Sequence, residues 1–182
     1  MSKRRKIINF IVEVSIFTAL GLVLDILGGA LFDLVWPNGG SVSLAMICIF
    51  IVAYRRGLAG GLLTGLLVGT IQILWAGAGN IVHPFQAMLD YTFAYMSAGL
   101  AGIVRKQVMV PNWKQTLFIS LSIVVCCLVR LMCHTLSGIL YWGSTFTASI
   151  LYNGTFILTT IIVCCIITSI IMRNKFFTNV KN

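Results

Sequence analysis

The sequence predicts an all-α membrane protein of six transmembrane helices with both termini in the cytoplasm. Of its 182 residues, 59% are hydrophobic and only 9% are charged, and the mean hydropathy is +1.00. Soluble domains usually carry about 25% charged residues, so this composition excludes an ordinary globular fold. The apolar segments are about 20 residues long, the length of helix that crosses about 30 Å of hydrocarbon.

Apolar runs and helix breakers divide the chain into six expected spans. These spans cover residues 8–32, 42–54, 58–76, 84–104, 115–140 and 146–172. The connections between them are too short to hold a soluble domain. The whole chain, residues 1–182, is therefore expected to form one transmembrane domain.

Basic residues indicate the orientation of these spans. Twelve of the 13 Lys and Arg residues lie at span ends or in short loops, and only Arg130 lies inside an apolar segment. The basic stretches are 3–6, 55–56, 105–114 and 173–181. The connections without Lys or Arg are 33–41, 77–83 and 141–145. The positive-inside rule places the basic stretches in the cytoplasm, and the same distribution argues against a nucleic-acid surface.

The N-terminal segment has a basic start and an apolar run, as a cleaved signal peptide would. The run continues to about Phe32, which is longer than a signal core of 7 to 15 residues, and no A-x-A site follows it. We therefore expect this segment to be the first span.

All six cysteines lie inside expected spans, without C-x-x-C or Cys/His metal spacing. We expect small apolar core side chains and neither a disulfide framework nor a metal site. These residues are Cys48, Cys126, Cys127, Cys133, Cys164 and Cys165.

Small residues recur every four positions in two of the spans. In the third span they are Gly57, Gly61, Gly65 and Gly69. This spacing lines one helix face and lets a neighbouring backbone approach closely. Ser15 and Ala19 have the same spacing in the first span, where the face could serve internal packing or the docking of another membrane subunit.

Ionisable side chains inside the spans are the most informative positions, because each costs about 3 kcal/mol unless it is paired or faces water. They are Glu13, Asp25, Asp90, Arg130 and His134. Arg130 and His134 are four residues apart and share one helix face, which Gly138 and Trp142 continue. This row of residues is typical of one wall of a small-molecule pocket.

Other spans add polar groups at a similar depth. Gln86 and Asp90 are four residues apart with Tyr91 adjacent, and Asn153 lies early in the last span. A carboxylate, an amide, an imidazole and aromatic rings suit a flat, nitrogen-rich ligand, including a cationic one. Asp90 could instead form a purely structural ion pair with Arg130.

No catalytic residue or cofactor is predicted, because the sequence has no H-E-x-x-H motif, no paired Asp motif and no Walker P-loop. Cys133 and His134 are neighbours, but adjacent side chains on a helix point about 100° apart. Without an ATP site, the chain could drive uphill uptake of a ligand only with separate ATPase subunits or with an ion gradient. The second case would make the chain an autonomous carrier that uses Asp90, Arg130 and His134 as an ion relay.

These residues resemble the thiamine-specific S components, the substrate-binding subunits of energy-coupling factor transporters. The similarity runs from Glu13 to Asn153-Gly154 and is most specific between Arg130 and Ser144. The resemblance implies a six-helix subunit of the bacterial plasma membrane that binds thiamine near its outer face. It also implies partners, namely one transmembrane coupling protein and two cytoplasmic ATPases.

Carried over position by position, the resemblance implies a set of ligand contacts. They are Trp36, Asp90, Tyr91, Arg130, His134, Gly138, Trp142 and Asn153. Trp142 is expected to stack on a ligand ring, Asp90 to supply counter-charge, and His134 and Asn153 to orient the ligand. The resemblance also implies that Ser15 and Ala19 dock against the coupling protein.

Two positions depart from the family pattern. Asp90 stands where the family usually has a glutamate, and Ala148 stands where it has a tyrosine. A thiamine precursor or another heteroaromatic vitamin therefore stays open as the ligand.

Overall fold

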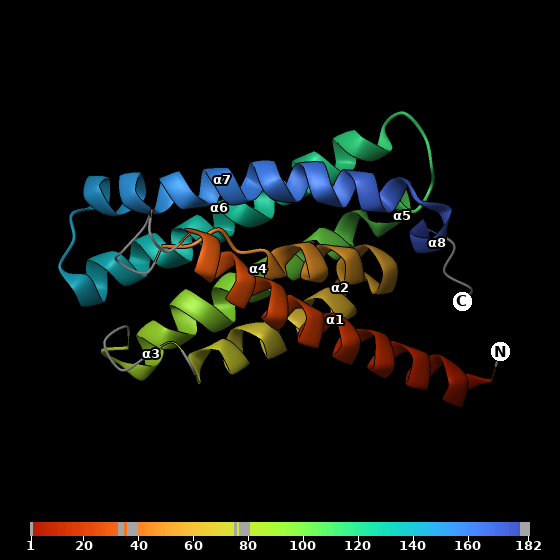
Figure 1. The fold of residues 1–182 in the computed structure, drawn as a ribbon, viewed down its shortest axis with the longest axis horizontal. Coiled ribbons are helices and arrows are strands. Elements are labelled where there is room, and N and C mark those ends of the chain that lie inside the picture. The colour runs from red at the N-terminus through yellow and green to blue at the C-terminus, as the bar shows by residue number, and fades with distance from the viewer. Residues whose placement is uncertain (1, 33–34, 36–39, 75, 77–80, 179–182) are drawn as a thin grey trace.

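The computed structural model describes residues 2–32, 35, 40–74, 76 and 81–178, and in this part of the chain the fold is all-α. Five helices here are long and apolar enough to cross a membrane. They are α1 (Lys3–Phe32), α2 (Ala45–Ile73), a composite helix (Pro84–Val108), α6 (Gln115–Trp142) and α7 (Phe146–Arg173). They pack lengthwise into one bundle (Figure 1).

The composite helix changes its hydrogen-bonding pattern along its length. Its parts are α3 (Pro84–Ala87), the π-helix η2 (Met88–Phe93), α4 (Ala94–Gly99), the 3-10 helix η3 (Leu100–Val104) and α5 (Arg105–Val108). A short helix, α8 (Lys175–Thr178), follows α7. π-helical turns are rare and occur often at functional sites, and this one contains Asp90 and Tyr91.

Four of the six expected spans each correspond to one long helix: α1, the composite helix, α6 and α7. The other two, 42–54 and 58–76, both fall within α2. The backbone of α2 is not helical at Gly57, where φ is 78° and ψ is −168°. This conformation favours glycine, because a Cβ would clash there with the backbone.

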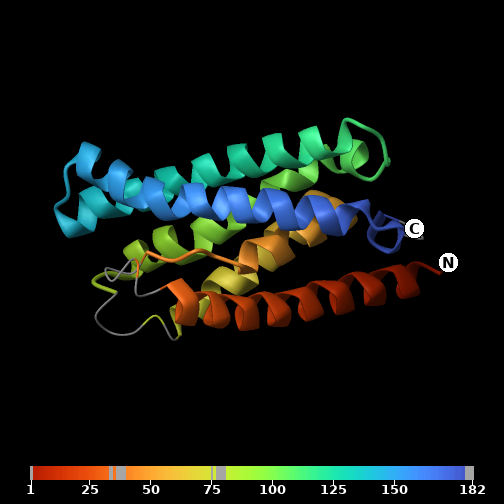
Figure 2. The ribbon, with the colours of Figure 1, turned by 45° about the horizontal axis from the view of Figure 1, so that its top comes forward.

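The chain reverses direction at Gly57, so α2 has two arms, 45–56 and 58–73. A Cβ built on Gly61 would lie 2.6 Å from the Cβ of Ala53. Eight residues along a straight helix would separate these positions by about 12 Å. The orange and yellow arms accordingly lie side by side in both ribbon views (Figures 1 and 2).

Both ends of the chain lie at the same end of the bundle (Figures 1 and 2), which we call the termini end. The turn at Gly57 lies there too, since Nη1 of Arg55 donates a hydrogen bond to the carbonyl of Phe177 over 2.6 Å. Nε of Arg105 donates to the carbonyl of Arg55 over 3.0 Å. Basic residues distant in sequence therefore gather at the termini end, and we call the opposite end the far end.

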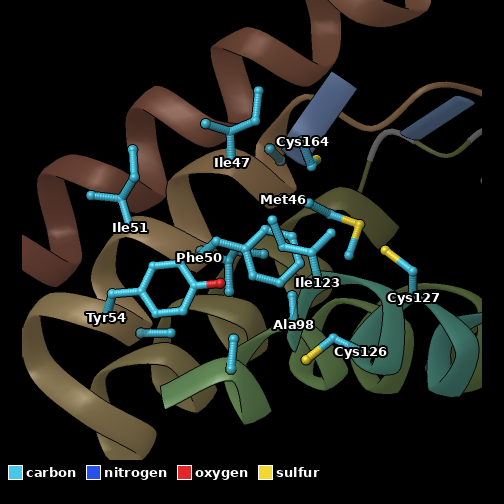
Figure 3. Packing of buried hydrophobic residues seen from close by; sticks show 14 of the residues in the cluster. Met46, Ile47, Phe50, Ile51, Tyr54, Ala98, Ile123, Cys126, Cys127 and Cys164 are labelled. Carbon is cyan, nitrogen blue, oxygen red and sulfur yellow. The ribbon is translucent and has the colours of Figure 1, made fainter. Parts of the chain in front are cut away.

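The first arm of α2 forms the centre of the core, because every residue from Ala45 to Tyr54 is buried. A helix that is apolar all round is typically enclosed by other helices. Figure 3 shows Phe50 and Tyr54 beside Ile123 and Cys126. The prediction of core side chains is confirmed for the four buried cysteines, Cys48, Cys126, Cys127 and Cys164, whereas Cys133 and Cys165 are partly exposed.

The predicted glycine face packs the second arm of α2 directly on the composite helix. A Cβ on Gly65 would lie 2.5 Å from the carbonyl oxygen of Tyr95, and one on Gly69 would lie 2.5 Å from that of Tyr91. Only glycine permits such a close backbone approach. Gly57 serves the turn instead, so the face consists of Gly61, Gly65 and Gly69.

Candidate functional site

Three ionisable side chains inside the bundle meet between the composite helix and α6. Asp90 comes from the π-helix, and Arg130 and His134 come from successive turns of α6. The predicted four-residue spacing holds for Arg130 and His134, and the packing of the composite helix on α6 brings Asp90 to the same place. The α6 pair contributes a cation and an imidazole, and the π-helix contributes the carboxylate.

Asp90 accepts three hydrogen bonds. Its Oδ2 accepts from Nε2 of Gln86 and from Oγ of Ser137, each over 2.6 Å. Its Oδ1 lies 3.1 Å from Nδ1 of His134. A carboxylate offers about four acceptor positions on its two oxygens, and three partners already contact them. Gln86 and Ser137 are almost fully buried, so these two partners are fixed by groups that cannot turn to water.

His134 lies between Asp90 and Arg130 and connects them. Nε of Arg130 donates to Nε2 of His134 over 3.2 Å, so this ring nitrogen carries the lone pair. Nδ1 then carries the proton and donates to Asp90. The imidazole is therefore neutral in this arrangement. The suggested direct ion pair is replaced, among the described residues, by a chain from guanidinium through imidazole to carboxylate.

Arg130 is 3% exposed, and its guanidinium contacts neutral side chains. Its Nη1 lies 2.7 Å from Sδ of Met46, and its guanidinium carbon lies 4.9 Å from the ring centroid of Tyr95. A cation over a ring face is attracted by the negative face of the π-system. The guanidinium is thus held rigidly, with an aromatic ring on one side and the imidazole on another.

Gly138, which follows His134 in the predicted row on α6, faces α7. A Cβ on Gly138 would lie 2.3 Å from Oγ of Ser149, so Gly138 is a close-packing position. Nδ2 of Asn153 donates to the carbonyl of Ser149 over 2.9 Å, which turns this amide along its own helix. The hydrogen bonds found for Asn153 among the described residues go to Ser149 and not to Asp90 or His134.

The aromatic candidates are placed differently from one another. Trp142 is 49% exposed at the far end of α6, and Tyr91 is half-buried beside Asp90. Trp36 lies outside the described residues. Phe156, which the sequence did not single out, packs edge-on against His134 with ring centroids 5.7 Å apart.

Several site residues escaped the sequence analysis because their partners are distant along the chain. Ser137 and Met46 are neutral residues in apolar helices, and nothing in their local sequence marks them. Tyr95 is 3% exposed and lies between Arg130 and Asp25. Asp25 could be recognised as a costly carboxylate in an apolar span, but its surroundings could not be predicted.

Three comparisons relate the chain to known proteins. The thiamine transporter protein family (Thia_YuaJ) matches residues 11–179. Thiamine transporter ThiT of Bacillus subtilis is 34% identical over 181 residues, covering 92% of this chain and 91% of the relative. Thiamine transporter ThiT of Lacticaseibacillus paracasei is 26% identical over 106 residues, covering 54% of this chain and 53% of the relative. A solved structure of ThiT from Listeria monocytogenes has a TM-score of 0.80 at 27% identity, covering 95% of this chain and 98% of the solved chain.

Proposed function

Because the chain belongs to the thiamine transporter protein family, we propose that the cluster of Asp90, His134 and Arg130 is its thiamine-binding site. The chain is a multi-pass membrane component of vitamin uptake, a transport protein rather than an enzyme. The observation that supports this site is the carboxyl group of Asp90, which contacts Gln86, His134 and Ser137 inside an apolar bundle.

Thiamine consists of an aminopyrimidine ring and a cationic thiazolium ring. Asp90 supplies counter-charge or accepts a hydrogen bond from the ligand amine. His134 orients the ligand through its ring nitrogens, beside Arg130. Asp90 already accepts from Gln86, His134 and Ser137, so the ligand shares its oxygens with these donors or displaces one of them.

The remaining predicted contacts complete the site around this cluster. Trp142 and Tyr91 supply aromatic faces, and Gly138 lets α7 approach closely. Asn153 contributes its amide after turning from the carbonyl of Ser149. Trp36, which lies outside the described residues, stays a ligand contact that the family resemblance implies.

Thiamine titration of the purified protein, followed by tryptophan fluorescence, tests this function. We expect submicromolar or tighter binding, and we expect Trp142→Ala to weaken it by about 1 to 3 kcal/mol because a stacked, desolvated ring is lost. Trp113→Ala is the matched control, since Trp113 is 83% exposed and precedes α6 at the termini end. Titration with the pyrimidine half and the phosphate esters separates thiamine from its precursors. Folded, ligand-free protein that does not respond to thiamine contradicts the proposal.

We further propose six membrane crossings with both termini in the cytoplasm. Two observations support this proposal: both chain ends lie at one end of the bundle, as an even number of crossings would place them (Figure 2), and the reversal at Gly57 divides α2 into two arms. The basic residues at the termini end support the cytoplasmic assignment. A C-terminal green fluorescent protein fusion should therefore fluoresce in intact cells.

We propose that α1 docks on the transmembrane coupling protein, which works with two cytoplasmic ATPases. Ser15 and Ala19 are both exposed, so the face that they share is not used for packing within this chain. Apolar residues extend the same side of the helix, including Ile16 at 58% and Leu20 at 45% exposure. The small residues leave room for a partner helix to approach closely.

Ala19→Trp is expected to leave thiamine binding unchanged and to abolish ATP-dependent uptake in liposomes that contain all the subunits. Leu158→Trp is the matched control, because Leu158 is 60% exposed on α7, away from α1. Normal uptake by Ala19→Trp contradicts docking through this face. Uptake driven by a pH gradient in liposomes with this protein alone would favour the ion-coupled carrier instead.

A further inference from the structure

A second carboxylate lies inside the bundle near the candidate site. Asp25 of α1 accepts hydrogen bonds from four donors. They are Nε2 of Gln72, the hydroxyl of Tyr95, the backbone N–H of Ala45 at 2.9 Å and Oγ of Ser43 at 2.9 Å. An ionised carboxylate offers about four lone-pair positions and has no proton to donate. Four partners thus fill the acceptor positions that an ionised Asp25 would offer.

Arg130 lies between Asp25 and Asp90 without forming an ion pair with either of them in the part of the chain that the structure describes. On one side Tyr95 intervenes, with its hydroxyl on Asp25 and its ring 4.9 Å from the guanidinium carbon. On the other side His134 intervenes, with one ring nitrogen on each partner. Each carboxylate is thus one aromatic ring away from the same cation.

These three groups do not balance in charge. With His134 neutral and both carboxylates ionised, two carboxylates and one guanidinium leave one uncompensated negative charge in this partly buried cluster. An uncompensated charge is costly in an apolar bundle, and a ligand cation would offset it. If Asp25 were neutral, Arg130 would balance Asp90 and the cluster would have no need of a cation.

We propose that Asp25 is a positioning residue that makes the site select a cationic ligand. It holds Tyr95 against Arg130, and its negative charge offsets part of the positive charge of Arg130 that would otherwise offset Asp90. The proposal rests on the thiamine site proposed above. It goes beyond that site because Asp25 acts through Tyr95 and Arg130 rather than by touching the ligand. It also assigns to α1, the proposed docking helix, a part in ligand choice.

Asp25 also has a structural role that any test must separate from this one. Ala45 is the first residue of α2, so the bond from its N–H places a negative charge at a helix N-terminus. Loss of that bond alone would destabilise the fold and weaken all ligands alike. The diagnostic quantity is therefore the ratio of two affinities, for thiamine and for an uncharged analogue of the same shape.

The experiment compares thiamine with its isostere in which a neutral thiophene replaces the thiazolium ring. Dissociation constants for both are measured by calorimetry with the wild type and Asp25→Asn. We expect the wild type to prefer the cation and Asp25→Asn to reduce this preference about tenfold, or about 1.4 kcal/mol. Asp25→Ser is the second neutral variant, because its hydroxyl can still accept from Ala45, and it should reduce the preference similarly.

Glu13→Gln is the matched control, since it removes the same charge from the same helix at the termini end, where Glu13 pairs with Arg55 and Arg56. The Glu13→Gln variant should prefer thiamine over the neutral isostere as strongly as the wild type does. Two results would overturn the role of Asp25 and leave the proposed function standing. One is an unchanged preference for thiamine over the neutral isostere in both Asp25 variants, and the other is no such preference in a wild type that binds thiamine. Binding of neither ligand by the wild type overturns the proposed function and this inference with it.

Discussion

Asp90→Asn is expected to weaken thiamine binding about 100-fold, or about 2.7 kcal/mol, while the protein remains folded. The variant keeps the size of the side chain and removes the charge that offsets the ligand cation. It also places an amide beside the donors of Gln86 and Ser137, where one N–H group would face another donor. Calorimetric titration of the purified protein measures the change.

Ser137→Ala is the matched control for Asp90→Asn. It removes one hydrogen bond to the same carboxylate oxygen, a bond to a charged acceptor that is worth about 1.5 to 3 kcal/mol to the fold, and leaves the charge in place. We expect its affinity to fall less than tenfold. Wild-type affinity in Asp90→Asn would show that the carboxylate takes no part in binding.

Gly65→Ala is expected to destabilise the fold by about 2 to 3 kcal/mol, because the added methyl group meets backbone rather than a flexible side chain. Its Cβ would lie 2.5 Å from the carbonyl oxygen of Tyr95 and 2.8 Å from Cα of Met96. The second arm of α2 must then move away from the composite helix that carries Asp90. Thermal unfolding in detergent measures the loss, and thiamine affinity should fall with it.

Gly154→Ala provides the comparison on α7. Nothing lies within 4 Å of a Cβ at this position, so the substitution costs no packing and gains helix propensity. We expect wild-type stability or slightly more. Equal stability of the two alanine variants would contradict the close packing of the glycine face.

Much of the fold could be predicted because apolar length and loop charge are local properties of the sequence. The expected spans 84–104, 115–140 and 146–172 each correspond to one long helix. The reversal at Gly57 could also be inferred, from the basic turn that precedes it. The π-helix at Met88–Phe93 could not, because it depends on how the composite helix packs against the second arm of α2.

The site was predictable where its residues lie on one helix and unpredictable where they meet across helices. Four-residue spacing correctly put Arg130 beside His134. The same spacing placed Gly138 in that row, although its position is set by contact with Ser149 of α7. The bonds of Asp25 to Gln72 and Tyr95 join segments far apart in sequence, and no local pattern carries that information.

The most direct test of the site is a structure of the protein with thiamine bound. We expect the ligand to lie between the composite helix and α6, with a polar atom within hydrogen-bond distance of a carboxylate oxygen of Asp90. The contrary result is thiamine elsewhere, with the bonds of Asp90 to Gln86, His134 and Ser137 unchanged. One such place is the groove at the termini end between α1 and the turn of α2, beside Glu13.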